Sequence, residues 1–156
     1  MNKGTACANG ELAAIIENSE SLIWAVDKDY RYTVYNTRYY RWLDAWGVQV
    51  ALQDSALHPI FPEDVIEKWR EWYDTALSGG VLKKEERYVG PLGESVVHDF
   101  HFTPITKCGH VYGVSCMATD VTSFRDTEEE LRAARDRNLR AVKELIKDPL
   151  SLLKGS

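Results

Sequence analysis

Cysteines are few in this 156-residue sequence, and their spacing is not that of a metal or disulfide site. There are three of them, Cys7, Cys108 and Cys116, and none forms a C-x-x-C pair. An odd number without paired spacing argues against a disulfide framework and against a structural zinc site. We therefore expect reduced thiols, with Cys116 inside a strand, and no metal site.

Long apolar runs are also missing from the sequence. No apolar segment approaches the roughly 20 residues that a membrane-spanning helix needs. The N-terminal stretch MNKGTACANGEL has no apolar signal core either. These absences predict a cytoplasmic chain without direct membrane contact, and they leave open a membrane segment elsewhere in a longer parent protein.

Positive charge is scarce relative to negative charge. Lysine and arginine number 19 against 24 aspartates and glutamates, which gives a formal net charge of −5. The 44% hydrophobic and 28% charged residues are ordinary for one folded domain. A nucleic-acid-binding protein concentrates basic residues on one face, so we expect no nucleic-acid partner.

Motifs for catalysis are absent as well, including any nucleotide-binding motif. Acid/base chemistry needs two suitable groups inside one cavity. His98 and Asp99 are neighbours in a predicted strand and point to opposite faces, while Asp99 and His101 share a face that we expect to be the outer one. We expect no enzyme in this chain, with a small α+β isomerase-like enzyme as an alternative.

Apolar periodicity predicts an α+β domain followed by a long helix. Residues 1–10 are expected to be flexible, and 149–156 to form a tail after Pro149. Alternating or continuous apolar residues predict five strands, at 21–26, 31–36, 81–89, 95–105 and 111–121. Apolar residues at three- and four-residue steps predict helices at 11–18, 37–47, 62–77 and 124–148. This order favours one antiparallel five-stranded sheet with helices on one face.

Four segments within residues 11–123 give the chain its resemblance to the PAS domain family. IIENSESLIWAVDKDYRYTVYN resembles the opening helix and first hairpin of the family, and HPIFPED resembles the start of its long central helix. HDFHFTPI resembles the strand that ends in a Ser/Thr-Pro-Ile step, and GVSCMATDVT resembles the last strand, which ends in Asp-Ile-Thr. Each segment alone is a weak signature, but all four occur in the order and at the spacing of the family.

The resemblance implies a sensory or interaction module of a signalling protein, such as a histidine kinase of a two-component system or a diguanylate cyclase. The kinase or cyclase domain would belong to a parent protein, and because no histidine follows His110, a phospho-acceptor would lie outside this chain. PAS domains often hold a small molecule between sheet and helices and pass a signal into a C-terminal helix that dimerises. A ligand-free PAS interaction module with a filled core is the alternative.

A ligand pocket is predicted on the strand face that bears His98, Phe100 and Phe102, because the corresponding face contacts flavin in relatives. His98 has two interpretations, a hydrogen-bonded core histidine or a polar contact to a ligand. Aromatic residues at such positions can also simply fill the core. The full set of pocket candidates is Ala25, Tyr40, Trp69, Tyr73, Tyr88, His98, Phe100 and Cys116.

The identity of any cofactor is unknown from the sequence. Light-responsive flavin-binding relatives carry a reactive cysteine in the helical segment after the first hairpin, where this chain has none, so no covalent flavin adduct is expected. Haem-binding relatives supply a histidine from the long central helix, and EDVIEKWREWYDTAL has none. His58 precedes that helix and is a minor candidate ligand.

The C-terminal helix carries a sparse seven-residue repeat. Phe124, Leu131, Asn138 and Leu145 recur at steps of seven, with Thr127, Ala134 and Ala141 as the complementary positions. Such a seam, with one asparagine, is typical of two-stranded coiled coils. We expect a homodimer and a partner or output domain beyond the helix, with Asp120 and Thr122 relaying the signal. A solvated helix that folds back on its own domain is the alternative.

Overall fold

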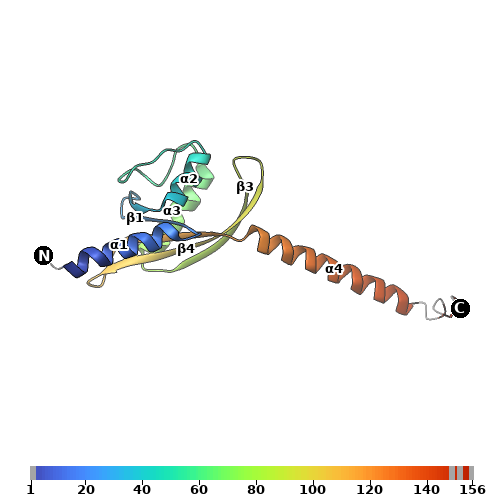
Figure 1. The fold of residues 1–156 in the computed structure, drawn as a ribbon. Coiled ribbons are helices and arrows are strands. Elements are labelled where there is room, and N and C mark those ends of the chain that lie inside the picture. The colour runs from blue at the N-terminus through green and yellow to red at the C-terminus, as the bar shows by residue number, and fades with distance from the viewer. Residues whose placement is uncertain (1–2, 148–149, 151–152, 155–156) are drawn as a thin grey trace. The chain divides into compact units, whose positions relative to one another are not determined.

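The computed structural model describes the backbone of residues 3–147, 150 and 153–154, and side chains from residue 10 onward. Five strands form one antiparallel sheet in the order β2-β1-β5-β4-β3 (Figure 1). The strands are β1 (Leu22–Asp27), β2 (Tyr32–Tyr35), β3 (Leu82–Val89), β4 (Ser95–Lys107) and β5 (His110–Asp120). The helices are α1 (Lys3–Asn18), α2 (Thr37–Ala45), α3 (Glu63–Leu77) and α4 (Thr122–Lys147). The predicted α+β fold with a long C-terminal helix is confirmed.

Four helix boundaries differ from the sequence prediction. α2 ends at Ala45 rather than at residue 47, and α3 begins at Glu63 rather than at residue 62. α1 begins at Lys3, eight residues before the predicted start at residue 11, and α4 begins at Thr122 rather than at Phe124. Helical hydrogen bonding in α4 starts as soon as the last strand ends, because the Arg125 amide already donates to the carbonyl of Val121. The helix end predicted at Pro149 lies outside the described residues.

Tight hairpins set the register of the sheet. Between β4 and β5, Cys108 and Gly109 have φ values of 51° and 77°, as the two central residues of a type I′ turn require. This turn pairs Lys107 with His110, and a register shift between Ile105 and Thr106 then brings His98 opposite Asp120 at the other end of the two strands. The long β4–β5 hairpin therefore places His98 beside the last residue of the sheet domain.

Asn36 fixes the start of α2 against the sheet. Its side chain is fully buried, accepts hydrogen bonds from the amides of Tyr39 and Ile23, and donates to the carbonyls of Ser21 and Ile16. The first amides of a helix have no partner within the helix, and the Asn36 side-chain oxygen accepts from one of them. Its amide group also donates to two backbone carbonyls outside the helix. The orientation of α2 thus follows from one polar side chain.

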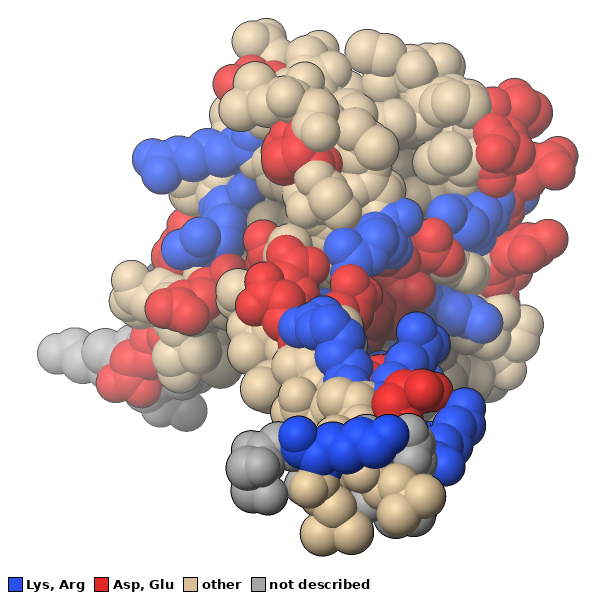
Figure 2. Space-filling view, turned by 90° about the vertical axis from the view of Figure 1, so that its right-hand side faces the viewer, with Lys and Arg blue, Asp and Glu red and all other residues tan. Residues whose placement is uncertain are grey.

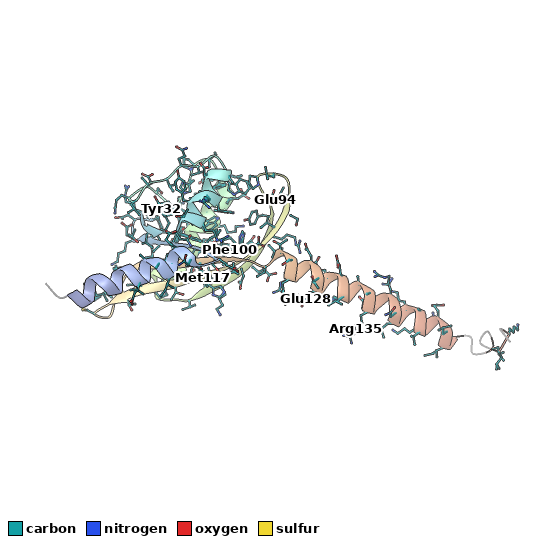
Figure 3. All side chains as sticks on the ribbon, in the orientation of Figure 1. Tyr32, Glu94, Phe100, Met117, Glu128 and Arg135 are labelled. Atoms are coloured by element: carbon teal, nitrogen blue, oxygen red, sulfur yellow. The ribbon has the colours of Figure 1, made fainter. Side chains whose placement is uncertain are left out.

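One face of the sheet carries the core, and α2 and α3 cover it (Figure 1). Tyr32 and Phe100 lie between the sheet and these helices, whereas Met117 lies on the opposite face and is 37% exposed (Figure 3). Alternation along the strands produces this division, because successive side chains point to opposite faces. The helix-facing layer is predominantly aromatic.

The chain divides into two units, one up to Asp120 and one from Val121 onward, and α4 forms the second. None of the described side chains of α4 is buried, and Phe124 and Leu131 are 64% and 67% exposed. Ion pairs such as Arg125–Glu128, at 2.6 Å, lie along its surface. A helix that buries so little of its apolar surface gains little stability from its own chain.

Acidic and basic side chains are interspersed on the face shown in Figure 2. None of the described helices is both long enough and apolar enough to span a membrane.

Candidate functional site

A cavity of about 270 Å³ lies among α2, α3, β3, β4 and the loop at residues 56–62. Four tryptophans line it, Trp42 from α2, Trp46 from the turn directly after α2, and Trp69 and Trp72 from α3. Tyr39 and Trp42 on α2 and Trp46 at its C-cap fall at steps of three and four, so this segment supplies much of the wall. The cavity is therefore predominantly apolar and aromatic.

One part of the aromatic layer is closely packed, and we call Trp24, Tyr73 and Phe102 the closed cluster. All three side chains are fully buried. The Trp24 ring stacks on Tyr39 at 4.4 Å between centroids and meets Phe102 edge-on at 6.1 Å. The Trp24 indole N–H donates to the Tyr73 hydroxyl at 3.0 Å, so its buried polar atom has a partner.

A second part borders the cavity, and we call Trp42, Trp46 and Tyr88 the open cluster. Trp46 lies 6.3 Å from Trp42 and 6.2 Å from Tyr88 between ring centroids. The indole N–H of Trp46 is buried and has no hydrogen-bond partner among the described residues. A buried donor without an acceptor is destabilising, so the packing of the described residues leaves this one polar atom unsatisfied.

A hydrogen-bonded chain connects the cavity wall to the end of the sheet. The Trp42 indole N–H donates to the Tyr88 hydroxyl oxygen at 3.1 Å, and this hydroxyl is 2.6 Å from His98 Nδ1. Burial raises the pKa of Tyr88 to about 12, so the phenol is neutral and its proton is free to donate to His98. His98 then accepts at Nδ1 and carries its proton at Nε2.

The charge state of His98 depends on burial and on Asp120. Burial lowers the pKa of His98, and the negative charge of Asp120 opposes this shift. His98 pairs with Asp120 across β4 and β5, and it is 5% exposed. The neutral imidazole is therefore the form that the folded protein favours near neutral pH.

A second chain of hydroxyl groups runs from the core to the cavity. The hydroxyls of Tyr39 and Tyr32 are 2.8 Å apart, and the Tyr32 hydroxyl is 2.7 Å from His58 Nε2. Burial lowers the pKa of His58 and raises the pKa of both tyrosines, so all three groups are neutral near neutral pH. The polar atoms of this wall are satisfied within the chain.

The charged groups that line the cavity form an ion pair. Lys68 Nζ lies 3.0 Å from Glu86 Oε2, and both side chains are partly exposed, at 38% and 32%. The Lys68 ammonium also lies 5.4 Å from the ring centroid of Trp72. The cavity wall thus carries one positive and one negative charge that neutralise each other.

Three of the eight predicted pocket residues line the cavity, namely Trp69, Tyr88 and Phe100. Cys116 and Tyr73 are buried in the core beyond the lining. His98 lies behind Tyr88, to which it is hydrogen-bonded. Tyr40 stacks on Tyr35 at 6.3 Å and does not line the cavity.

Ala25 is on the other face of the sheet. The helix-facing cluster contains Trp24 and Val26, and strand alternation directs Ala25 away from it. The sequence prediction placed Ala25 in the pocket, across from the strand face that bears His98. Its position in β1 instead directs its side chain to the other face of the sheet. The sequence SLIWAV already implies this, because Ala25 lies between Trp24 and Val26 in the strand.

Trp42, Trp46 and Phe61 are cavity residues that the sequence prediction did not name. The spacing of Tyr39, Trp42 and Trp46 along α2 and its C-cap was the signal that could have identified two of them. Phe61 lies in the loop before α3 and packs edge-on against Trp46 at 5.7 Å. A loop residue without periodicity gives no comparable signal.

The remaining predicted positions lie outside the cavity. Asp120 ends β5, and Thr122 begins α4. The seam residues Phe124, Leu131, Asn138 and Leu145 are all exposed on α4. The Asp99 and His101 side chains pair at 3.1 Å on the sheet face opposite Phe100, and neither lines the cavity. None of the described residues form a group of three or more His, Cys, Asp or Glu that could hold a metal ion.

Solved structures with a similar fold share little sequence identity with this chain. The PAS domain of BvgS from Bordetella pertussis has a TM-score of 0.59 and 16% identity, covering 85% of this chain and 99% of that one. An RNA-binding light-oxygen-voltage receptor has a TM-score of 0.60 and 18% identity over 85% of this chain. The Vibrio cholera VqmA–ligand–DNA complex has a TM-score of 0.59 and 16% identity over 72% of this chain.

The matched region makes up only part of two of these proteins, 38% of the light-oxygen-voltage receptor and 51% of VqmA. No curated protein matches the chain. A family model described as PAS fold matches residues 16–126, which is more than half of the sequence. By its fold and by this match, the chain belongs to the PAS family of sensory domains.

Proposed function

We propose that this chain is the sensory and dimerisation module of a signal-transduction protein. In this proposal a small molecule binds in the aromatic cavity, and binding changes the state of α4 and of an output domain such as a histidine kinase. The observation that carries the proposal is the hydrogen-bonded chain from Trp42 through Tyr88 to His98. It joins a cavity wall to the strand pair that ends at Asp120, immediately before α4.

A ligand can act on this chain by moving a wall residue. If binding shifts Trp42 or Tyr88, the hydrogen bond between the Tyr88 hydroxyl and His98 Nδ1 is weakened or strengthened. The balance between its neutral and charged forms then changes beside Asp120. A ligand shifts an equilibrium only by its difference in affinity for two states, so these wall contacts are where that difference arises.

Dimerisation through α4 is the second part of the proposal. The apolar seam residues Phe124, Leu131 and Leu145 are 64%, 67% and 50% exposed in the single chain. A second copy of α4 would cover them at seven-residue intervals, with Asn138 fixing the register. Asp120 and Thr122 at the junction are the proposed relay positions.

The partners and location follow from the same features. The VqmA structure is described as a complex with ligand and DNA. That description supports ligand sensing by this fold, whereas the interspersed charges of Figure 2 lead us to propose a protein output rather than direct nucleic-acid contact. Free Cys108 and Cys116 are consistent with the cytoplasmic location that we propose.

A ligand-free interaction module is the competing function, and the fully packed closed cluster favours it. Mass spectra of the purified chain under native and denaturing conditions separate the two. Our proposal predicts extra mass on the native protein that is lost on denaturation, or a rise in melting temperature with added small molecules. A chain that carries no extra mass and responds to no small molecule in a broad screen would support the ligand-free module.

Dimerisation is tested with a matched pair of charge substitutions in α4. We expect Leu131→Lys to shift the protein from dimer to monomer in light scattering, because a charge would replace an apolar seam contact. Ala133→Lys, on the outer face of the same heptad, should leave the dimer intact. Equal effects of the two substitutions, or a wild-type monomer, would rule out the seam.

A further inference from the structure

His98 is enclosed by aromatic rings at the buried end of the hydrogen-bonded chain. It is 5% exposed, its ring stacks on Tyr88 at 5.7 Å between centroids, and Trp42 meets it edge-on at 6.3 Å. Its Nδ1 atom lies 2.6 Å from the Tyr88 hydroxyl oxygen. Because close packing restricts rotation of the ring, a change in its protonation has to be met by the groups bonded to it.

The direction of each hydrogen bond in this chain follows from the chemistry of its donors. The Trp42 indole N–H can only donate, so the Tyr88 hydroxyl oxygen accepts from it at 3.1 Å. The Tyr88 hydroxyl has a single proton, which it donates to Nδ1 of His98 while that nitrogen is unprotonated. The observed contacts are therefore those of the neutral imidazole.

A proton that adds to Nδ1 from the solvent reverses the second of these hydrogen bonds. Nδ1 then carries an N–H and can only donate, so the Tyr88 oxygen receives donors from both Trp42 and His98. Tyr88 keeps its own proton, because burial raises the pKa of Tyr88 to about 12, and that proton has to point away from His98. Since Tyr88 lines the cavity, the polarity of the cavity wall changes with the charge of His98.

The charges around His98 make the two states differ most at the end of the sheet. The charged residues that share its side of the neighbouring strands are Lys84 and Glu86 in β3 and Asp120 in β5. Glu86 lies directly across from His98, but Lys68 from α3 balances its charge at 3.0 Å, and α2 presents the uncharged Trp42. Burial lowers the pKa of His98, and the charge of Asp120 opposes this shift. A protonated His98 is therefore stabilised chiefly by Asp120, the last residue of β5.

We propose that His98 is a proton-operated switch, through which the chain responds to mild acidification without a small molecule. In the neutral state Tyr88 donates to His98, and in the acid state His98 donates to Tyr88 and attracts Asp120. Asp120 precedes Val121, whose carbonyl accepts from the Arg125 amide in the first turn of α4. A carboxylate next to a helix N-terminus stabilises the first turn, and a positive charge on His98 offsets that effect.

An NMR titration of the full chain from about pH 8 to pH 5 tests the switch. The four histidines give ring-proton signals and the five tryptophans give indole N–H signals, and His98→Gln and Trp42→Phe identify those of His98 and Trp42. We expect the Trp42 indole signal to move with the same midpoint as the His98 ring protons, below pH 6.5. The reason is that the Tyr88 oxygen, which accepts from Trp42, gains a second donor.

His98→Gln and His101→Gln form a matched pair of variants. Glutamine keeps a neutral acceptor for the Tyr88 hydroxyl, so His98→Gln should retain the fold and abolish the titration of the Trp42 signal. His101 pairs with Asp99 on the other face of the sheet, so His101→Gln should leave that titration unchanged. Circular dichroism at each pH checks that every variant stays folded.

Tyr88→Phe tests the direction of the hydrogen bond. It removes the hydroxyl that donates to neutral His98 while keeping the stacked ring, so the pKa of His98 should rise. An unchanged or lowered pKa of His98 in this variant would overturn the switch. So would a Trp42 signal that does not titrate, that still titrates in His98→Gln, or that loses its titration in His58→Gln instead.

The switch goes beyond the proposed function, and its failure is distinguishable from the failure of small-molecule sensing. If the titration contradicts the switch, bound mass or a raised melting temperature still supports the proposed sensing of a small molecule. A chain that binds no small molecule and nevertheless shows the titration of Trp42 with His98 retains the switch and loses the ligand.

Discussion

The closed and open clusters belong to one aromatic layer, yet they differ in packing and in hydrogen bonding. In the closed cluster the rings are fully buried, and the Trp24 N–H has its acceptor in Tyr73. In the open cluster the rings border a cavity, and the Trp46 N–H has no acceptor among the residues that the structure describes. Similar aromatic residues can therefore either complete a core or leave space beside it. The two clusters also differ in whether the buried tryptophan N–H has an acceptor among the described residues.

The largest expected difference is in the cost of truncating a tryptophan. Trp24→Ala should lower the free energy of unfolding by about 3–5 kcal/mol, because it leaves a cavity in a closely packed site. Trp46→Ala should cost clearly less, since the cavity beside it already exists and its N–H loses no partner. Urea denaturation of both variants measures the difference, and equal costs would show that the clusters are packed alike.

A larger side chain should stabilise the protein beside the cavity and destabilise it in the closely packed core. Val65 lines the cavity, so Val65→Phe should raise the free energy of unfolding by about 0.5–2 kcal/mol. Val114 is fully buried under the helices, so Val114→Phe should lower it by about 1–3 kcal/mol through overpacking. Thermal and urea denaturation check both values. Destabilisation by Val65→Phe similar to that by Val114→Phe would mean that the cavity is not free space.

The smallest effect concerns the pH dependence of stability near the open cluster. The pKa of His98 lies below its ordinary value of 6.5 in the folded protein, so the unfolded chain binds more protons as the pH falls. The contribution of neutral His98 to the free energy of unfolding is fully present above pH 6.5. It is lost as the pH falls from 6.5 toward the pKa of His98 in the folded protein. Stability should therefore rise with pH in that window, with a smaller slope in His98→Gln.

Asp120→Asn sharpens this test, because it removes the charge that raises the pKa of His98. The pKa of His98, followed by NMR titration of its ring protons, should fall further in this variant. Asp99→Asn is the matched control, since Asp99 pairs with His101 on the other face of the sheet. An unchanged or raised pKa of His98 in Asp120→Asn would contradict the assigned electrostatics.

The fold could be predicted from the sequence because each element carries a strong local pattern. Alternation in SLIWAV and HDFHFTPI gave the core strands, and Gly47 and Pro62 mark the limits of α2 and α3. The start of α1 at Lys3 was missed, because residues 3–10 lack the apolar repeat that identifies a helix. The loop at 48–60 has no periodicity, and it forms turns and bends that anchor to Arg31 and Tyr32.

The site could be predicted only in part, because a cavity depends on distances that periodicity does not encode. Tyr88 and Phe100 were found from their strand positions, and Trp69 from its place in α3. The sequence could not show that Tyr88 stands between His98 and the cavity, since this depends on the register of β3 against β4, which pairs Glu86 with His98. Nor could it show that the Trp46 N–H is left without an acceptor.

In the proposed mechanism, the cavity is coupled to the start of α4 through Tyr88 and His98. NMR of the full chain with a small molecule that raises its melting temperature tests it most directly, by following the Trp46 indole signal and the backbone amides of Asp120 to Phe124. We predict that this molecule moves both sets of signals in the wild type, and that in Tyr88→Phe it moves the indole signal alone. Amides that stay unmoved in the wild type while the indole signal shifts, or that move equally in Tyr88→Phe, would contradict the claim.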